Sequence, residues 1–84
     1  VPKGAWVIQL GAFDNDAAAR AKLSKAQDRA KRVVADAAAF TEPVAVNGGT
    51  LFRARFGGFD SVDQAKAACS ALKRMDFACV PMKP

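Results

Sequence analysis

The side chains of this chain that are best suited to ligand binding are an amide and two guanidinium groups on two apolar segments. Gln9 belongs to the first segment, and Arg53 and Arg55 belong to the second. A guanidinium offers several fixed N–H donors, and an amide offers both donors and an acceptor. With Val7 and Leu51 beside them, these groups suit a neutral, hydroxyl-rich ligand such as a sugar chain better than a bare polyanion. The alternative is an ordinary solvated surface.

The composition excludes most catalytic chemistry within this chain. It contains no His and only two Cys, which excludes His-based triads and leaves too few ligands for a structural zinc site. Glu42 is its one Glu, and the sequence offers no convincing pair of carboxylates for acid–base work. We therefore expect a binding module with no catalytic residue, no metal and no cofactor.

Two strands with alternating apolar residues position the amide and the guanidinium groups. Residues 6–10 alternate between two faces until Gly11 ends the strand. Residues 51–56 alternate in the same way until Gly57 and Gly58 end the second strand. The faces predicted to be buried are Trp6, Ile8 and Leu10 on the first strand and Phe52, Ala54 and Phe56 on the second. The faces predicted to point away from the core are Val7 and Gln9, and Leu51, Arg53 and Arg55.

Each of these strands precedes an Ala-rich helix. The first helix is predicted over about residues 15–38, with Asn15 among its N-cap candidates and with Phe40 and Pro43 ending it. The second helix opens at a capping box formed by Ser61 and Gln64. The apolar stripes are Ala19, Leu23, Ala26, Ala30, Val33 and Ala37 on the first helix and Val62, Ala65, Cys69 and Leu72 on the second.

Two further strands complete a β-α-β-β-α-β order. Residues 43–46 form a short edge strand, Asn47-Gly48-Gly49 predicts a hairpin turn, and residues 77–82 form the last strand. An internal repeat supports this order, because Gly11-Ala12-Phe13-Asp14 matches Gly57-Gly58-Phe59-Asp60 at an offset of 46 residues. The fold class is therefore α+β, with a four-stranded antiparallel sheet, its first and third strands central, and two helices on one face. We expect one domain over residues 1–84, with residues 1–4 and 83–84 as tails.

The two cysteines offer extra stability to a thin core. Alanine supplies 19 of the hydrophobic residues of this small domain. Cys69 lies on the apolar stripe of the second helix, and Cys79 lies on the last strand. A disulfide between them would stabilise the fold by about 2–3 kcal/mol in an oxidising compartment, and it would turn Val80 and Met82 towards the face that carries Gln9. The alternative is two reduced thiols packed in the core.

The positive charge is concentrated in the first helix. The whole sequence carries +5, and residues 20–32 contain six basic residues against Asp28 alone. This segment would lie on the side of the sheet opposite Gln9. It predicts either a solvated helix face or a contact with an anionic polymer or membrane surface. No apolar run approaches the roughly 20 residues of a membrane span.

Two segments resemble the SPOR domain (sporulation-related repeat), a bacterial peptidoglycan-binding module. The segment Trp6-Val7-Ile8-Gln9-Leu10-Gly11-Ala12-Phe13 resembles its opening Q-x-G-x-F strand. The segment Leu51-Phe52-Arg53-Ala54-Arg55-Phe56-Gly57-Gly58-Phe59 resembles its L-[YF]-R-V-x-[VF]-G-x-F strand and turn. Together with the helix after each segment, the resemblance covers nearly the whole chain. It implies a ferredoxin-like or RNP-like fold whose open sheet face binds glycan strands stripped of their stem peptides, as found at division septa.

The resemblance also implies the site residues. The family's glycan-contacting Gln falls at Gln9, its Arg at Arg53, and the apolar residue of its last strand at Val80. Ala12 stands where Ser is frequent, and Leu51 stands where some members have Trp. Arg55, next but one to Arg53, is added to these residues. The predicted glycan-binding site is Gln9, Ala12, Leu51, Arg53, Arg55 and Val80.

The cysteine pattern is similar to one in modules of this family attached to periplasmic D-alanyl-D-alanine carboxypeptidases. We therefore expect a periplasmic, monomeric module excised from a larger protein. The resemblance implies that this larger protein is such an enzyme. In this interpretation the module itself does not catalyse a reaction and targets the attached enzyme or division protein to the septum.

Two other functions fit the predicted order of elements. An RNA-binding module of the RRM type shares this order, but its aromatic residues point outwards to stack on bases. Phe52 and Phe56 alternate towards the core instead, so we expect no nucleic acid partner. A protein–protein interaction module would dock through the sheet or the basic first helix and would have no affinity for glycan.

Overall fold

The sheet is built around two central strands. A computed structural model describes residues 4–84, so most of the predicted tail at residues 1–4 lies outside the described residues. The strands are β1 (Trp6–Phe13), β2 (Ala38–Val46), β3 (Gly49–Phe59) and β4 (Val80–Met82). They pair antiparallel in the order β2-β3-β1-β4. The prediction that the first and third strands are central is confirmed.

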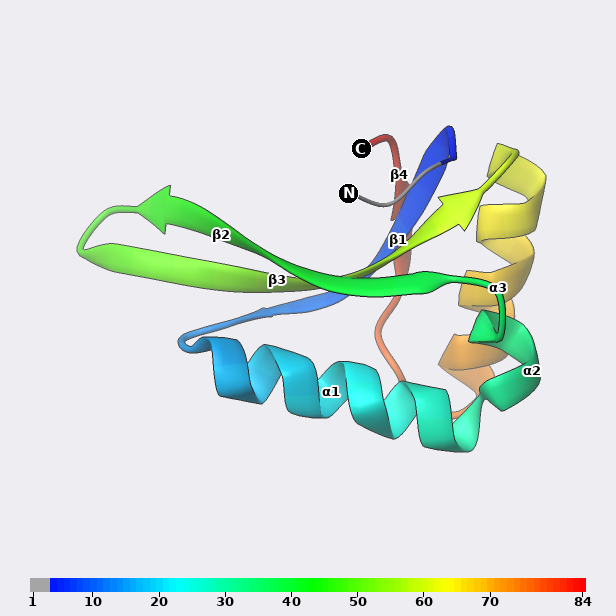
Figure 1. Cartoon of the computed structure of the whole chain (residues 1–84), viewed down its shortest axis with the longest axis horizontal. Helices are drawn as coiled ribbons and strands as arrows, with labels where there is room; N and C mark the ends of the chain where they lie inside the picture. The colour runs from blue at the N-terminus through cyan, green and yellow to red at the C-terminus, as the bar shows by residue number, and fades with distance from the viewer. Residues whose placement is uncertain (1–3) are drawn as a thin grey trace.

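The helices cover one face of this sheet and leave the other bare. They are α1 (Asp16–Arg29), α2 (Lys31–Val34) and α3 (Val62–Arg74). In Figure 1, α1 runs beneath the sheet, and α2 and α3 close one end of the molecule. The predicted N-caps form, because Asn15 Oδ1 accepts a hydrogen bond from the N–H of Ala18 and Ser61 Oγ accepts one from the N–H of Gln64. The predicted α+β fold class is confirmed.

The predicted single helix over residues 15–38 is wrong in its second half. The helix breaks at Ala30, which has φ −121° and ψ 43°, and α2 ends after one turn at Val34. Ala30 and Val34 are both buried, so the break turns this last turn of helix into the core. The following alanines join β2, where Ala38 lies opposite Gly57 and every residue to Val46 has a partner on β3. Sheet pairing therefore overrides the high helix propensity of alanine in this segment.

The central strands are longer than predicted, and the last strand is shorter. β1 continues past Gly11 through a β-bulge, since Gln9 and Gly11 face consecutive residues of β3 and Leu10 is the extra residue between them. β3 likewise continues through both glycines to Phe59. β4 begins only at Val80, because the N–H of Phe77 still bonds to the carbonyl of Leu72 and so terminates α3. β2 is an edge strand and therefore tolerates Pro43, which has no N–H to donate to a neighbouring strand.

The core lies between the inner face of the sheet and the helices. Ile8, Leu10, Phe56 and Phe59 supply its largest buried sheet side chains. The helices contribute mostly alanine, whose small side chain lets their backbones approach the sheet closely. The fully or nearly fully buried residues of the helical stripes are Ala19, Leu23, Ala26, Ala30, Val34, Ala65, Ala68, Cys69 and Leu72. The predicted inward faces are confirmed, with Trp6 and Phe52 half-buried at the edge of this core.

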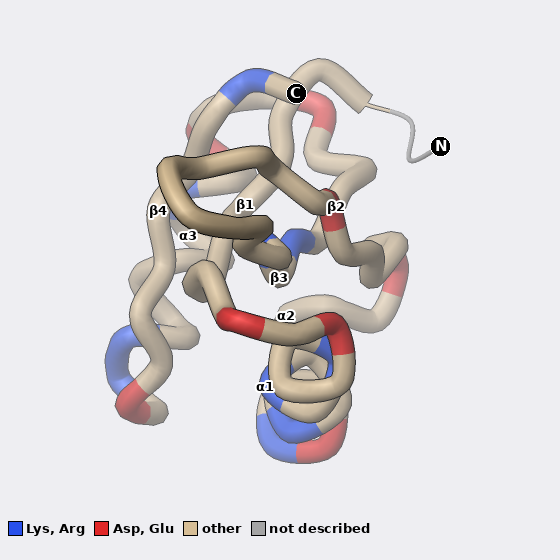
Figure 2. The backbone as a smooth tube through the Cα atoms, turned by 90° about the vertical axis from the view of Figure 1, so that its left-hand side faces the viewer, with Lys and Arg blue, Asp and Glu red and all other residues tan. Residues whose placement is uncertain are grey.

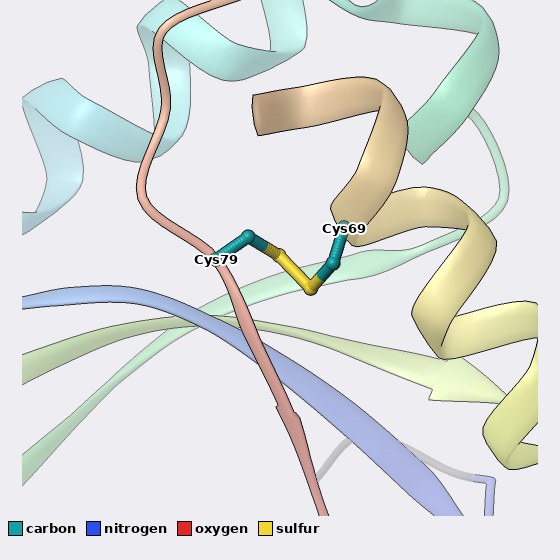
Figure 3. Close-up of a disulfide and its surroundings, with 2 residues drawn as sticks. All are labelled: Cys69 and Cys79. Carbon is teal, nitrogen blue, oxygen red and sulfur yellow. A yellow bond between two sulfur atoms is a disulfide. The ribbon is translucent and has the colours of Figure 1, made fainter. Parts of the chain in front are cut away.

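A disulfide joins α3 to the segment that leads into β4. Cys69 and Cys79 form this bond with their Cα atoms 5.1 Å apart, and both residues are buried (Figure 3). The bond fixes the start of the short edge strand β4, which has only three residues of sheet pairing to hold it. Consistent with the predicted orientation, Phe77 and Cys79 are buried and Val80 is exposed.

Replacing both cysteines by alanine is expected to lower the free energy of unfolding by about 2–3 kcal/mol, because the unfolded chain loses a closed loop. Urea denaturation with and without reductant measures this change. Ser70→Ala, on an exposed position of α3, is the matched control and should leave the unfolding midpoint in place. An unchanged midpoint for the double variant would contradict a stabilising role of the bond.

Besides the disulfide, a side-chain hydrogen bond joins the start of α1 to the middle of β2. Thr41 Oγ1 donates a 2.6 Å hydrogen bond to Asp16 Oδ1, and Arg20 forms an ion pair with the other oxygen of this carboxylate. The hydrogen bond from Thr41 and the contact with Arg20 hold the pKa of Asp16 below its usual value of 3.8. The carboxylate also lies in the first turn of the helix, where negative charge is favourable.

Thr41→Val is expected to weaken the dependence of folding stability on pH in the acid range. Because the pKa of Asp16 is lower in the folded chain than in the unfolded one, its contribution is present at neutral pH and is lost as the pH falls below about 4. Thermal unfolding of the wild type and the variant between pH 7 and pH 2 measures the difference, which should shrink towards the acid end. A constant difference over this range would show that the carboxylate plays no part in it.

Candidate functional site on the open sheet face

All six predicted site residues lie on the face of the sheet that the helices leave bare. One cross-strand row runs over all four strands, a second lies beside it on β1, β3 and β2, and a third lies on β3 and β2. The rows are Val80, Gln9, Arg55 and Phe40; then Ala12, Arg53 and Glu42; then Leu51 and Val44. We call these nine residues and Met82 the open face. Sheet pairing thus brings together residues that lie up to 71 positions apart in the chain.

Gln9 and Arg55 occupy the centre of the open face. They are equivalent in the internal repeat, and they lie directly opposite each other on β1 and β3. Arg55 Nε donates a 3.0 Å hydrogen bond to Gln9 Oε1. A guanidinium has no acceptor, so the amide oxygen must face it. The Nε2 donors of Gln9 are therefore the part of this side chain that remains available to a ligand.

Arg55 lies on the predicted face but is buried there, with only 5% of its surface exposed. Besides the bond to Gln9, its Nη1 forms a 3.3 Å ion pair with Glu42 Oε2, and its Nη2 lies 3.2 Å from Met82 Sδ. The description of this guanidinium as a free surface donor therefore needs correction. Through these three contacts it links β3 to β1, β2 and β4.

The same side chain accounts for the burial of Val7, which the alternation predicts to face solvent. Val7 is only 3% exposed, although it lies on the side of β1 away from the helices. It pairs with Met82 on β4 and with Gly57, which has no side chain, on β3. A guanidinium that starts on β3 and reaches Met82 must cross β1, and so it covers this part of the strand.

Arg53 is the cation of the open face that remains available. It is half-buried, lies opposite Ala12 and Glu42, and has no ion-pair partner within residues 4–84, because the carboxylate of Glu42 turns to Arg55. The exposed Ala12 adds no bulk beside it. Its N–H groups are therefore free to bind a ligand that lies along the sheet.

Apolar side chains flank these polar groups on both sides. Val80, 55% exposed, pairs with Gln9 on one side of the centre, and Leu51 and Val44 pair with each other on the other. Phe40 and Glu42 are members of the open face that the sequence analysis missed, because it assigned them to the connection after the first helix. Their alternation with Thr41, which faces the helices, was the signal of a strand.

The open face is a surface rather than a pocket. A hollow of about 540 Å³ lies between α2 and α3 and is lined by Arg32, Asp36, Phe59 and Gln64 among others. None of the six predicted site residues lines it. Across residues 4–84 no group of His, Cys, Asp and Glu side chains is arranged to hold a metal ion. No helix in the same range has the length and apolar character needed to span a membrane.

Two solved structures share this arrangement of strands and helices. The crystal structure of the RlpA SPOR domain from Pseudomonas aeruginosa has 25% sequence identity and a TM-score of 0.77, covering 94% of this chain and 99% of that one. The solution structure of the peptidoglycan binding domain of the Bacillus subtilis cell wall lytic enzyme CwlC has 21% identity and a TM-score of 0.66, covering 100% and 94%. No curated protein matches this chain.

The family comparison agrees with the fold. The model of the SPOR domain family matches residues 2–83, which is nearly the whole chain. The two segments whose sequence resembles this family form the central strands β1 and β3, which carry the Gln9–Arg55 pair. The chain belongs to the SPOR domain family.

Proposed function

We propose that this chain is a non-catalytic peptidoglycan-binding module and that its open face binds the glycan strands. The observation that carries this proposal is the convergence of Gln9, Ala12, Leu51, Arg53, Arg55 and Val80 on one face. Membership of the SPOR domain family supports it. The B. subtilis structure with the same fold is itself a peptidoglycan binding domain.

The chemistry of the open face suits a sugar polymer. The Nε2 of Gln9 and the guanidinium of Arg53 provide donors to hydroxyl and carbonyl oxygens. Leu51, Val44 and Val80 provide apolar surface for the C–H faces and acetamido methyl groups of amino sugars. Strands in a sheet are about 4.8 Å apart, so the central row spans roughly 14 Å and can contact more than one sugar.

A flat site of this kind favours glycan stripped of its stem peptides. A peptide branch on the bound stretch would meet the sheet and hold the sugar rings away from Gln9 and Arg53. We therefore propose that the module recognises such denuded strands. In the cell envelope, this preference would target an attached enzyme or division protein to septal wall, and an oxidising periplasm would maintain the Cys69–Cys79 bond. We propose further that the attached enzyme is a carboxypeptidase and that the module is monomeric.

Gln9→Ala and Arg53→Ala are each expected to weaken binding to purified sacculi roughly tenfold, because each removes donors that no neighbour replaces. Co-sedimentation measures this loss, and binding of the wild type should increase after an amidase removes the stem peptides. Arg74→Ala, which removes the same charge from an exposed position of α3, is the matched control and should bind as the wild type does. Equal binding to intact and stripped sacculi, with neither sheet variant affected, would refute the proposal and favour a protein–protein module.

Arg55→Ala is expected to differ from Arg53→Ala by lowering stability as well as binding. The variant loses the hydrogen bond of the buried guanidinium to Gln9 and the packing of the aliphatic stem, at a cost of about 2–3 kcal/mol. Arg53→Ala should change the free energy of unfolding by less than about 1 kcal/mol. Urea denaturation of the two variants measures the contrast. Equal stability of the two variants would show that Arg55 does not organise the site.

A further inference from the structure

The entire net charge of this chain lies in the segment that forms α1 and α2. Residues 20–32 contain Arg20, Lys22, Lys25, Arg29, Lys31 and Arg32, with Asp28 as the one acidic residue among them. The seven basic and seven acidic residues elsewhere in the chain cancel. Figure 2 shows this basic segment beneath the sheet, on the side away from the open face. The charge therefore has no part in the proposed glycan site.

Most of these cations are exposed and unpaired within residues 4–84. Arg20 pairs with Asp16, and Lys22 lies 5.7 Å from the centre of the Phe77 ring. Lys25, Arg29, Lys31 and Arg32 are exposed, and none has an ion-pair partner among the described residues. We call these four residues the basic surface. Their charge is available to an external partner.

The spacing of this charge is unfavourable for the helix itself. Lys25 lies four residues before Arg29 and three after Lys22, and like charges at these spacings destabilise a helix by a few tenths of a kcal/mol per pair. The helix dipole favours cations in the last turn only, which accounts for Arg29 and not for Lys25. Asp28 alone offsets the repulsion. Folding thus gives no reason for this concentration of like charge.

The basic surface is elongated and contains a notch. At 1.5 Å per residue, Lys25 and Arg29 lie about 6 Å apart along α1, and Lys31 and Arg32 of α2 continue the row past the break at Ala30. At the break between α1 and α2, a notch of about 330 Å³ is lined by Asp28, Arg29, Lys31, Arg32 and Met75. Met75 brings the end of α3, with the exposed Lys73 and Arg74, to the same notch. Nearby acidic residues are Asp28, Asp36 and Asp76, so the surface stays predominantly positive.

We propose that the basic surface binds a linear polymer of repeated phosphate groups, independently of the open face. An elongated row of point charges matches a chain of regularly spaced anions better than a single compact anion. A membrane surface fits less well, because an interfacial helix inserts large apolar side chains between its cations. The outward residues here are Ala21, Ser24 and Gln27, and the apolar stripe of α1 is buried in the core. The module would thus hold a phosphate polymer and a glycan strand on opposite sides.

Calorimetric titration of the 84-residue chain with long-chain inorganic polyphosphate tests the proposal. The affinity should fall with rising salt at a log–log slope of roughly −3 to −4, as expected for the release of counterions from several phosphate contacts. Lys25→Gln/Arg29→Gln should reduce the affinity at least tenfold. The same variant should bind sacculi as the wild type does, so failure of this proposal is distinguishable from failure of the glycan site.

Lys66→Gln/Lys83→Gln is the matched control, since it removes the same charge from exposed residues outside the basic surface. It should change the affinity for polyphosphate less than about twofold, and circular dichroism at the titration temperature should show both variants folded. An equal loss in the two variants would overturn the proposal, because net charge alone would then explain binding. Binding to phosphatidylglycerol vesicles without binding to polyphosphate would overturn it in favour of a membrane surface.

Discussion

The pairing of β1 with β3 at Gln9 and Arg55 is the constraint on which the rest of the structure depends. On the inner side of this pair, Ile8 lies opposite Phe56 and forms the centre of the core under the helices. On the outer side, the guanidinium of Arg55 joins all four strands through Gln9, Glu42 and Met82. Each edge strand pairs with one of the two central strands. The register of this one pair thus sets both the core and the composition of the open face.

A thin core explains why separate fixed points recur at the edges of the fold. Alanine fills most of the helix–sheet interface, so little apolar area is available to hold the edge strands. The disulfide fixes the approach to β4, and Thr41 and Asp16 fix β2 to the start of α1. Arg55 plays the same part on the outer side, where a hydrophobic residue would offer no directional bond to β2. These contacts keep the edges of the binding surface in place.

The two faces of the domain differ in the kind of charge that they present. On the open face the buried cation, Arg55, is paired with Glu42, and Arg53 lies between Ala12 and Glu42 without an ion pair among residues 4–84. On the helical face four exposed cations lie without partners in the described chain. Hydrogen-bond donors spaced among apolar groups suit sugars, whereas unscreened point charges in a row suit a polyanion. The net charge therefore says nothing about the sheet site, although it is the most conspicuous feature of the composition.

Local patterns in the sequence were sufficient for the inner faces, the caps and the order of the strands. Strict alternation in residues 6–10 and 51–56 correctly placed Gln9, Arg53 and Arg55 on the face away from the helices. The same local reasoning failed where pairing with a distant strand decided the outcome. The sequence analysis assigned Ala38 to the first helix and residues 39–42 to the connection after it, yet these residues pair with β3 and form a strand. Phe40 and Glu42 consequently joined the open face only in the folded chain. The burial of Arg55 and Val7 also depended on tertiary structure, because the alternation of a strand tells which face a side chain takes and not what neighbouring strands place over it.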